Sequence, residues 1–285
     1  MAIKLVLCDM DGTLVPFGSE AVSQRTIAAV HRLMDAGIHF GPSSGREHSD
    51  IVRFFGGDES CLGTGIMGGG KQVFVDDTLV YRRIMPHDLL QELADTVRDI
   101  PGMLLNFYLP TDEQGRGRPE FGIAGMSEDE LQVFSEDVGM PYVGTFFRQL
   151  PQDITTAAIG IDVKQGQTLQ VVEGLRAAFS GLDFVQSAPF AFDVMEKGWS
   201  KVNALPIISE HLGVSVDEIA YFGDSHNDLT MMTAIPNSFC PVSGLDETKE
   251  VARYVIGACE DDGVAEVLES LAAQGGEIVP SDWSL

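Results

Sequence analysis

The sequence predicts an α/β fold, a doubly wound, mostly parallel, Rossmann-like core sheet with an inserted α+β cap domain. One observation is that short, nearly continuous apolar segments alternate with segments of helical periodicity. Another is that this alternation stops in the middle of the chain and resumes near its end. The 285 residues are enough for one large domain or two smaller ones.

The first half of the core begins with a strand at residues 3–8 (IKLVLC), whose branched apolar side chains are typical of a strand buried on both faces. Residues 23–36 repeat apolar side chains at helical spacing, with Ser23 as N-cap and Gly37 as terminator. Residues 38–46 and 60–70 indicate two further strands that run into loops of small residues. This strand and helix order favours a parallel sheet.

The pattern changes after residues 71–83, which predict a β-hairpin turning at Asp76 and Asp77. Strands then mix with amphipathic helices, one of which starts with a capping box at Ser127 and Glu130. We predict that this α+β insert covers residues 84–188 and that the core comprises residues 1–83 and 189–285. The second half of the core returns to helix, strand and helix, at residues 200–213, 218–223, 227–234 and 263–274.

The charge of the chain argues against several classes of partner. Eighteen Lys and Arg against 43 Asp and Glu give a formal charge of −25, which disfavours nucleic acid and anionic membrane surfaces. The four cysteines are scattered without a CxxC pair, so neither a disulfide framework nor a zinc site is indicated, and a cytoplasmic location fits best. We find no signal peptide and no apolar run of membrane length.

Four sets of polar residues stand where ligands bind in open parallel sheets, beyond the carboxyl ends of strands or beside them. They are DMDGT at residues 9–13, SSGR at 43–46, Lys201 in EKGWSK, and GDSHND at 223–228. A carboxylate at such an end can attack phosphorus and form an acyl phosphate, which suits Asp9. Asp11 should project to the same side in extended backbone and could move protons. Gly12 allows a sharp turn, and the Thr13 hydroxyl could orient a carboxylate.

This chemistry needs a divalent cation, because an ionised aspartate and a phosphate dianion repel each other. Asp9, Asp224, a backbone carbonyl and waters would suit octahedral Mg²⁺. Asp228, one helical turn after Asp224, could hold the waters or the neighbouring lysine. Ser44, the Gly45 N–H and the Lys201 ammonium could bind the phosphoryl oxygens.

Each motif also has an ordinary structural explanation. The first could be an acidic turn, SSGR a common loop, Lys201 a solvated helix residue, and GDSHND a helix N-cap. Their order and spacing along the chain favour the chemical interpretation. His226 is interpreted as a bystander, because the two-aspartate scheme already supplies acid and base.

In this order the four motifs resemble those of the haloacid dehalogenase (HAD) superfamily, and the insert resembles the cap of its Cof-type branch, inserted after the third core strand. The resemblance implies Asp9 as nucleophile and Asp11 as acid and base, with the Asp11 backbone carbonyl on the metal. It also implies phosphate binding by Ser44 and Lys201 and Mg²⁺ binding by Asp224. The supporting residues are Thr13, Arg46, Asn227 and Asp228.

One departure concerns the third strand, after which relatives usually carry Asn-Gly-Ala. Here the stretch is taken as GTGI at residues 63–66, with Thr64 as a replacement for the missing polar contact. The loop at residues 110–122 brings Arg116 and Arg118 into an acidic chain. It either meets a second anionic group of the substrate or is a mobile surface loop.

The leading hypothesis is a Mg²⁺-dependent phosphatase that acts on a small phosphorylated metabolite, a sugar phosphate, through an aspartyl-phosphate at Asp9. The alternatives are a phosphomutase of the phosphomannomutase-like type and a non-catalytic binding protein. The presence of the complete set Asp9, Asp11, Lys201 and Asp224 disfavours the binding protein. We expect a monomer or a homodimer in which the cap closes over the substrate.

Overall fold

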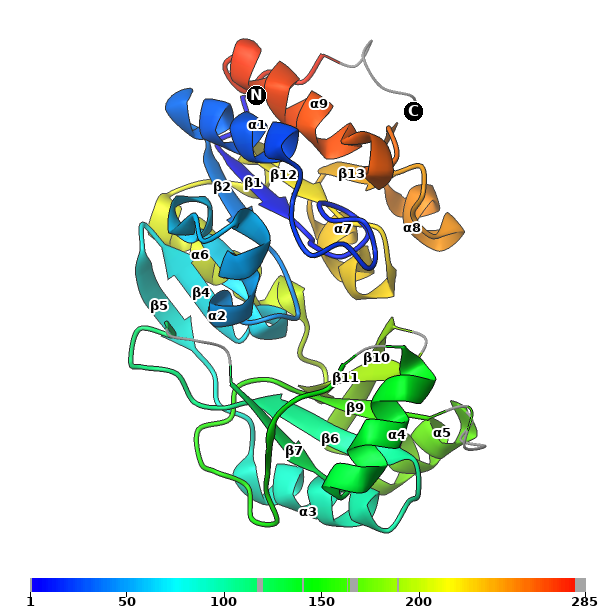
Figure 1. The fold of residues 1–285 in the computed structure, drawn as a ribbon. Coiled ribbons are helices and arrows are strands. Elements are labelled where there is room, and N and C mark those ends of the chain that lie inside the picture. The colour runs from blue at the N-terminus through cyan, green and yellow to red at the C-terminus, as the bar shows by residue number, and fades with distance from the viewer. Residues whose placement is uncertain are drawn as a thin grey trace. The chain divides into compact units, whose positions relative to one another are not determined.

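The computed structural model describes residues 2–116, 120–139, 141–162, 164, 169–188 and 190–279. The chain divides into two compact units, which are coloured by residue number in Figure 1. The core unit comprises Met1–Arg82 and Ser200–Leu285, and the insert unit comprises Arg83–Trp199. The predicted second boundary at residues 188/189 is therefore too early. Strand β11 (Ala191–Glu196) lies beyond that boundary but pairs with β9 (Ala157–Ile161) of the insert unit, which keeps this segment there.

The core unit is built on a five-stranded sheet in the order β14-β13-β12-β1-β2, in which neighbouring strands pair in parallel. Cys8 at the end of β1 is in register with Phe222 at the end of β12 and with Pro42 at the end of β2. The three segments that follow these strands therefore leave the sheet at the same edge. The strands are β1 (Leu5–Cys8), β2 (His39–Pro42), β12 (Ile219–Phe222), β13 (Asn237–Pro241) and β14 (Tyr254–Ile256).

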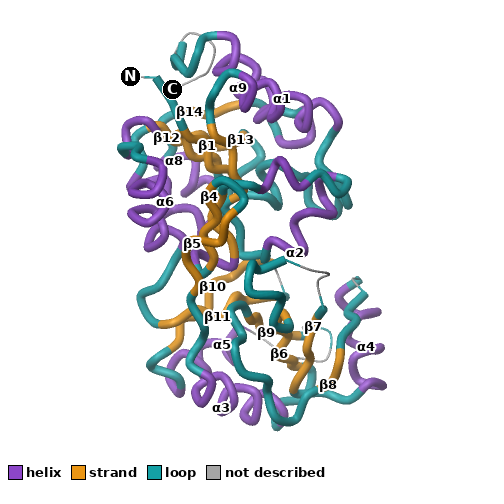
Figure 2. The backbone as a smooth tube through the Cα atoms, turned by 90° about the vertical axis from the view of Figure 1, so that its left-hand side faces the viewer, coloured by secondary structure: helices purple, strands orange, loops and turns teal. Residues whose placement is uncertain are grey.

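Helices cover both faces of this sheet, as Figure 2 shows with the strands between them. Alternate residues of β1 enter different cores, because successive side chains of a strand point to opposite faces. Val6 and Cys8 pack in one buried cluster, and Leu5 and Leu7 pack in another. Helices α1 (Gln24–Asp35) and α9 (Gly263–Ala273) contribute to the first cluster, and α6 (Leu205–Leu212) and α7 (Leu229–Ala234) contribute to the second. The predicted doubly wound fold is confirmed.

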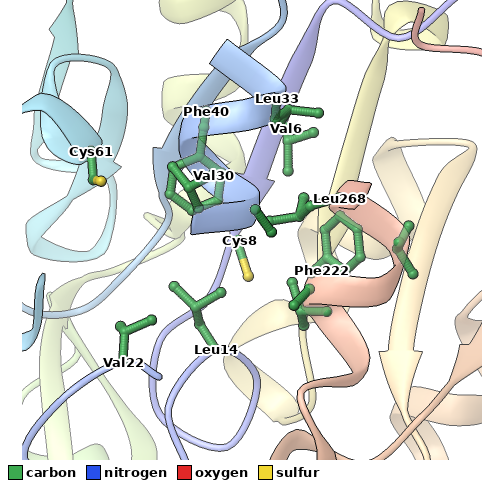
Figure 3. Packing of buried hydrophobic residues seen from close by; sticks show 14 of the residues in the cluster. Val6, Cys8, Leu14, Val22, Val30, Leu33, Phe40, Cys61, Phe222 and Leu268 are labelled. Carbon is green, nitrogen blue, oxygen red and sulfur yellow. The ribbon is translucent and has the colours of Figure 1, made fainter. Parts of the chain in front are cut away.

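Figure 3 shows the first of these clusters from close by, with Val30 and Leu33 of α1 and Leu268 of α9 beside Val6, Cys8 and Phe222. Leu33 and Leu268 are fully buried. Burying a leucine side chain stabilises a fold by roughly 1.5–3 kcal/mol, so the periodic apolar face of α1 explains why the helix lies here. Ser23 caps α1 as predicted, because its side chain accepts a hydrogen bond from the Thr26 N–H.

A third strand is present within residues 60–70 as predicted, but it is short and has an antiparallel partner that the sequence did not indicate. Strand β3 (Gly65–Met67) pairs antiparallel with β4 (Gln72–Val75), and β4 pairs with β5 (Thr78–Arg82). A single parallel bridge, between Ser43 and Ile66, connects β3 to the end of β2. The connection from β3 to β4 is too short for the crossover that a parallel pair requires. The hairpin turn predicted between β4 and β5 is confirmed, and both of its central residues have positive φ angles.

The insert unit contains a six-stranded, mostly antiparallel sheet in the order β10-β11-β9-β6-β7-β8. Helices α3 (His87–Arg98) and α5 (Leu169–Ala178) pack on one large apolar cluster of this sheet, and α4 (Glu128–Val138) packs on a smaller one. The capping box predicted at the start of α4 is present in Ser127 and Glu130. The unit is therefore an α+β module. Its remaining strands are β6 (Met103–Tyr108), β7 (Phe121–Ala124), β8 (Thr145–Phe146) and β10 (Leu182–Ala188).

Among the residues that the structure describes, no helix has both the length and the apolar character needed to cross a membrane.

Candidate active site

The carboxyl edge of the core sheet collects residues from the sequence motifs. Asp9 follows β1 directly, and its backbone N–H donates to the Phe222 carbonyl oxygen at 2.9 Å. The neighbouring strands β12 and β2 place Asp224 and Ser44 at the same edge, because the three strands are in parallel register. The side chains of Asp9, Asp224 and Ser44 are all buried.

Lys201 joins two of the carboxylates at this edge. Its Nζ donates to Asp9 Oδ1 and to Asp228 Oδ1, each at 2.7 Å. The Lys201 side chain is 3% exposed, so the alternative of a solvated helix residue is wrong. Burial alone would lower the pKa of Lys201, but the carboxylates of Asp228 and Asp9 outweigh it and raise this pKa well above its usual value. Lys201 is therefore an ammonium ion at neutral pH.

Asp228 is fully buried, with 0% of its side chain exposed, and both of its carboxylate oxygens accept hydrogen bonds. Oδ1 accepts from Lys201 and from the Tyr221 hydroxyl, the latter at 2.6 Å. Oδ2 accepts from the backbone N–H groups of Asp224 at 3.1 Å and Ser225 at 3.2 Å. The sequence reasoning missed Tyr221. Its signal was a tyrosine within the apolar strand IAYF, because a buried tyrosine hydroxyl usually has a hydrogen-bond partner.

The centre carries more negative charge than Lys201 can compensate. Carboxylate oxygens of Asp9, Asp224 and Asp228 lie within 4.8 Å of one another. Burial, followed by the charge of Asp228, raises the pKa of Asp9 well above its usual value. The same two causes raise the pKa of Asp224 to about 7. A cation between these carboxylates would stabilise their ionised forms.

Asp9 and Asp224 fit a divalent metal ion by the chemistry of their donors. Asp9 Oδ1 is bonded to Lys201 and Asp224 Oδ1 to the Thr13 hydroxyl, the latter at 2.8 Å. Within the described ranges, the Oδ2 atom of each carboxylate accepts no hydrogen bond. Two such oxygens are the ligands that hard divalent cations prefer. Asp228 already accepts four hydrogen bonds and would support such a site from outside.

Gly12 makes room for Asp224, which leads to a first prediction. An added Cβ at Gly12 would lie 2.6 Å from Asp224 Oδ2, and φ is +85°. We expect Gly12→Ala to displace the Asp224 carboxylate and to weaken divalent-cation binding by at least tenfold in isothermal titration calorimetry. Gly18→Ala is the matched control, because Gly18 has φ +82° but nothing within 4 Å of its added Cβ. Equal affinities in the two variants would contradict this interpretation.

The Asp11 side chain has a partner that the sequence motif does not reveal. The chain already turns at Met10, whose carbonyl oxygen accepts from the N–H groups of Leu14 at 2.9 Å and Val15 at 2.8 Å. Asp11 lies within this turn and forms an isolated parallel bridge with Val15. The Asp11 carboxylate pairs with Arg46, whose Nε donates to Oδ2 at 2.8 Å and whose Nη2 donates to Oδ1 at 3.1 Å.

The SSGR loop is held against the turn that follows β3. The N–H groups of Gly68 and Gly69 donate to the carbonyl oxygens of Arg46 and Ser44, at 2.8 and 2.9 Å. The Ser44 hydroxyl accepts from the Arg46 N–H at 3.2 Å, and the neighbouring Gly45 is half-buried. The Ser44 hydroxyl therefore keeps its proton for another acceptor.

The residues after the third strand are Gly68–Gly70 and not the stretch GTGI, because β3 spans Gly65–Met67. Three glycines offer no polar side chain there. Thr64 does not replace one, because its hydroxyl accepts from the Asp76 N–H at 3.5 Å beside the β4–β5 turn. Thr64 lines a cavity of about 290 Å³ together with His39, the first residue of β2. The proposed role of Thr64 as a polar replacement is wrong.

The remaining predicted residues take less central positions. The Ser225 hydroxyl donates to Asn227 Oδ1 at 2.9 Å, so Asn227 helps to order the loop after β12. His226 is exposed. In the insert unit the Arg116 N–H donates to Asp112 Oδ1 at 2.8 Å, whereas Arg118 lies outside the described residues.

A Rossmann-like sheet with a buried Asp–Lys–Asp centre at its carboxyl edge is typical of α/β enzymes. The sequence model of the haloacid dehalogenase-like hydrolase family matches residues 6–268, and the chain belongs to this family. The resemblance drawn from the four motifs is thereby confirmed.

Several known proteins are similar over nearly the whole chain. An HMP-PP phosphatase of Yersinia pseudotuberculosis is 25% identical over 274 residues, which is 93% of this chain and 94% of that protein. The structure of BT1666 from Bacteroides thetaiotaomicron, a phosphatase of the HAD superfamily, has a TM-score of 0.75 at 20% identity and covers 95% of both chains. An HAD subclass IIB sugar phosphatase has a TM-score of 0.74 at 19% identity, over 94% of this chain and 98% of that one. The structural similarities show the shared fold.

Proposed function

We propose that this HAD-superfamily phosphatase is Mg²⁺-dependent and hydrolyses a small phosphorylated metabolite, a sugar phosphate, through an aspartyl-phosphate at Asp9. The observation that carries the proposal is the buried pair of bonds from Lys201 to Asp9 and Asp228, which fixes one Asp9 oxygen and leaves the other available. The names of the relatives, an HMP-PP phosphatase and a sugar phosphatase, support the substrate class.

The proposed reaction has two halves. One oxygen of the Asp9 carboxylate attacks phosphorus, the ester P–O bond breaks, and Asp11 gives its proton to the leaving oxygen. Asp11 then takes a proton from a water molecule, whose oxygen attacks the phosphorus of the aspartyl-phosphate and releases the Asp9 carboxylate. The products are the alcohol and inorganic phosphate.

The metal ion would be held by carboxylate oxygens of Asp9 and Asp224 and by the backbone carbonyl of Asp11. When bound, Mg²⁺ would offset the repulsion between the Asp9 carboxylate and the phosphate dianion. Thr13 keeps Asp224 oriented through its hydroxyl hydrogen bond. Ser44, the Gly45 N–H and Lys201 are assigned to the phosphoryl oxygens, on which the charge of the transferring group is concentrated.

The insert unit is assigned to substrate selection. An aspartyl-phosphate can transfer its phosphoryl group in two ways. Transfer to water releases inorganic phosphate, and transfer back to a hydroxyl group of the sugar yields an isomeric sugar phosphate. The family of hydrolases to which the chain belongs favours water. Free phosphate as product supports the phosphatase, and an isomeric sugar phosphate would support the phosphomutase.

A metal-dependence assay gives the second prediction. We expect protein treated with a chelator to release no phosphate from p-nitrophenyl phosphate and to recover activity on addition of Mg²⁺. Asp224→Asn should raise the Mg²⁺ concentration needed for half-maximal activity by at least tenfold, because it removes one of the two anionic ligands. Asp217→Asn, at an exposed site of the same unit, is the matched control. A screen of phosphorylated metabolites then identifies the substrate.

Two results would contradict the proposal. Full activity in the presence of a chelator would exclude the metal-dependent mechanism. A wild-type protein that releases no phosphate from any ester with Mg²⁺ present would exclude the phosphatase and revive the non-catalytic binding protein.

A further inference from the structure

Arg46 bridges Asp11 and a second, buried carboxylate. Its Nη1 donates to Asp50 Oδ2 at 2.7 Å, while its Nε and Nη2 hold the two oxygens of Asp11. Asp50 lies on the short helix α2 (His48–Ile51), which directly follows the SSGR loop. One guanidinium therefore connects the catalytic edge to this helix.

Asp50 is itself firmly placed. Its side chain is only 4% exposed, and Arg53 Nε donates to its Oδ1 at 2.7 Å. Burial opposes the ionised form of Asp50, but Arg46 and Arg53 outweigh it and lower the pKa of Asp50 below the usual value. Asp50 is an anion at neutral pH, so it offers Arg46 a fixed charge-assisted hydrogen bond.

The guanidinium group of Arg46 also lies over the aromatic ring of Phe54. The centre of the Phe54 ring lies 5.0 Å from Arg46 Cζ and 4.0 Å from Arg53 Cζ. The negative face of an aromatic ring attracts a guanidinium held at such a distance. With Asp50 on one amino group and Phe54 against the guanidinium, the plane of Arg46 is set before it meets Asp11.

The orientation of the Asp11 carboxyl group depends on its contact with Arg46. The Asp11 side chain is 35% exposed, and it lies in the turn after β1, outside the strand itself. A guanidinium that contacts both carboxylate oxygens fixes the plane of the carboxyl group, and each oxygen keeps a second lone pair for a proton. Proton transfer depends on such positioning, because small displacements cost large factors in rate.

We propose that Asp50, acting through Arg46, positions the Asp11 carboxyl group for proton transfer to the leaving oxygen. This inference rests on the proposed function. Asp50 and Arg46 are positioning residues, and the proton moves from Asp11 to the ester oxygen as the P–O bond breaks and its electron pair stays on that oxygen. The connection from Asp50 to the reacting groups runs through side chains of the core unit alone.

The test uses leaving groups that differ in their need for a proton. Phenyl phosphate requires an acid because phenolate is a poor leaving group, whereas 2,4-dinitrophenyl phosphate releases a stable anion. A well-placed general acid contributes on the order of 10²–10⁴ in rate. Hydrolysis of the aspartyl-phosphate is common to both esters, so the comparison uses kcat/KM, which reports the leaving-group step alone. We expect Asp50→Asn to lower kcat/KM for phenyl phosphate by about tenfold or more, and for 2,4-dinitrophenyl phosphate by less than about threefold.

Two further variants separate positioning from folding. Arg46→Lys keeps the positive charge but cannot contact both oxygens of Asp11, so it should show the same selective loss. Inhibition by inorganic phosphate should be unchanged in Asp50→Asn, because the Ser44 and Lys201 contacts remain. Arg32→Gln is the control, because Arg32 pairs with Glu269 on the surface between α1 and α9.

The outcomes are distinct. A selective loss on phenyl phosphate supports the inference. An equal loss on both esters, or no loss on either, overturns it while the proposed function stands, since the wild-type protein would still hydrolyse both. If the wild-type protein hydrolyses neither ester with Mg²⁺ present, the proposed function fails, and the inference fails with it.

Discussion

Asp9→Asn is expected to lower phosphate release by at least about a thousandfold, because an amide is too weak a nucleophile to attack phosphorus. The substitution keeps the shape of the side chain. The amide oxygen can still accept the Lys201 hydrogen bond, which now spans 2.7 Å to Asp9 Oδ1. Mass spectrometry of acid-quenched protein should find a phosphorylated aspartate in the wild type and none in the variant.

The same variant should be at least as stable as the wild type. Burial and Asp228 raise the pKa of Asp9, so the folded state holds a proton at Asp9 more tightly than the unfolded state does. A carboxyl group whose pKa is raised in the folded state lowers the free energy of unfolding once the pH exceeds its pKa in the unfolded state. This loss grows until the pH passes the pKa in the folded state. A neutral amide removes this cost at neutral pH. Thermal unfolding in the absence of metal should therefore occur at an equal or higher temperature.

Asp35→Asn controls for this experiment, because it makes the same chemical change at an exposed residue at the end of α1. It should leave both activity and stability unchanged. Near-normal phosphate release by Asp9→Asn would show that Asp9 is not the nucleophile. A variant that is inactive because it has unfolded would contradict the stability argument and would be detected by its circular dichroism spectrum.

The local patterns in the sequence were sufficient to predict the fold class. Residues 5–8 are apolar without alternation, which is typical of a strand covered on both faces, and α1 begins and ends where its capping residues place it. The antiparallel pairing of the third strand with β4 was missed because a short apolar run does not reveal its partner. The boundary after the insert was missed because β11 has the composition of a strand of either unit, and only its pairing with β9 assigns it.

The candidate site could be predicted as a set of motifs but not as a network of contacts. Asp9, Lys201 and Asp228 were expected to lie together, since parallel strands bring their ends to one edge. The partner of Asp11 could not be foreseen, because no sequence pattern shows that Arg46, 35 residues further along the chain, meets its carboxylate. Asp50 and Tyr221 carry no motif of their own. Their importance depends on which buried group they contact, and this is a property of the packing.

Lys201→Met is expected to affect both activity and stability. It removes the ammonium that lies 2.7 Å from both Asp9 and Asp228. Removing one partner of a buried ion pair typically destabilises a protein by about 3–5 kcal/mol, because the other charge stays buried. Loss of a preorganised charge on the transferring phosphoryl group costs on the order of 10²–10³ in kcat. We expect lower stability in chemical denaturation and at least a hundredfold lower phosphate release.

A second substitution separates the two effects. Asp228→Asn removes the charge that Lys201→Met leaves uncompensated. Its amide oxygen can still accept from the backbone N–H groups of Asp224 and Ser225, and its NH2 group can donate to the Tyr221 hydroxyl oxygen. The double variant should therefore recover part of the lost stability, a coupling that a double-mutant cycle measures. Its activity should stay low, because the ammonium needed by the phosphoryl group is still missing.

Lys197→Met is the matched control for this substitution. Lys197 is largely exposed, and its Nζ pairs with Asp183 at 2.8 Å on the surface of the insert unit. Exposed pairs of this kind contribute roughly 0–1 kcal/mol, so the control should change stability little and leave kcat as it is. If the double variant regained activity along with stability, Lys201 would act only by supporting the fold. If stability returned without activity, the ammonium would have a separate task at the phosphoryl group, beyond neutralising Asp228.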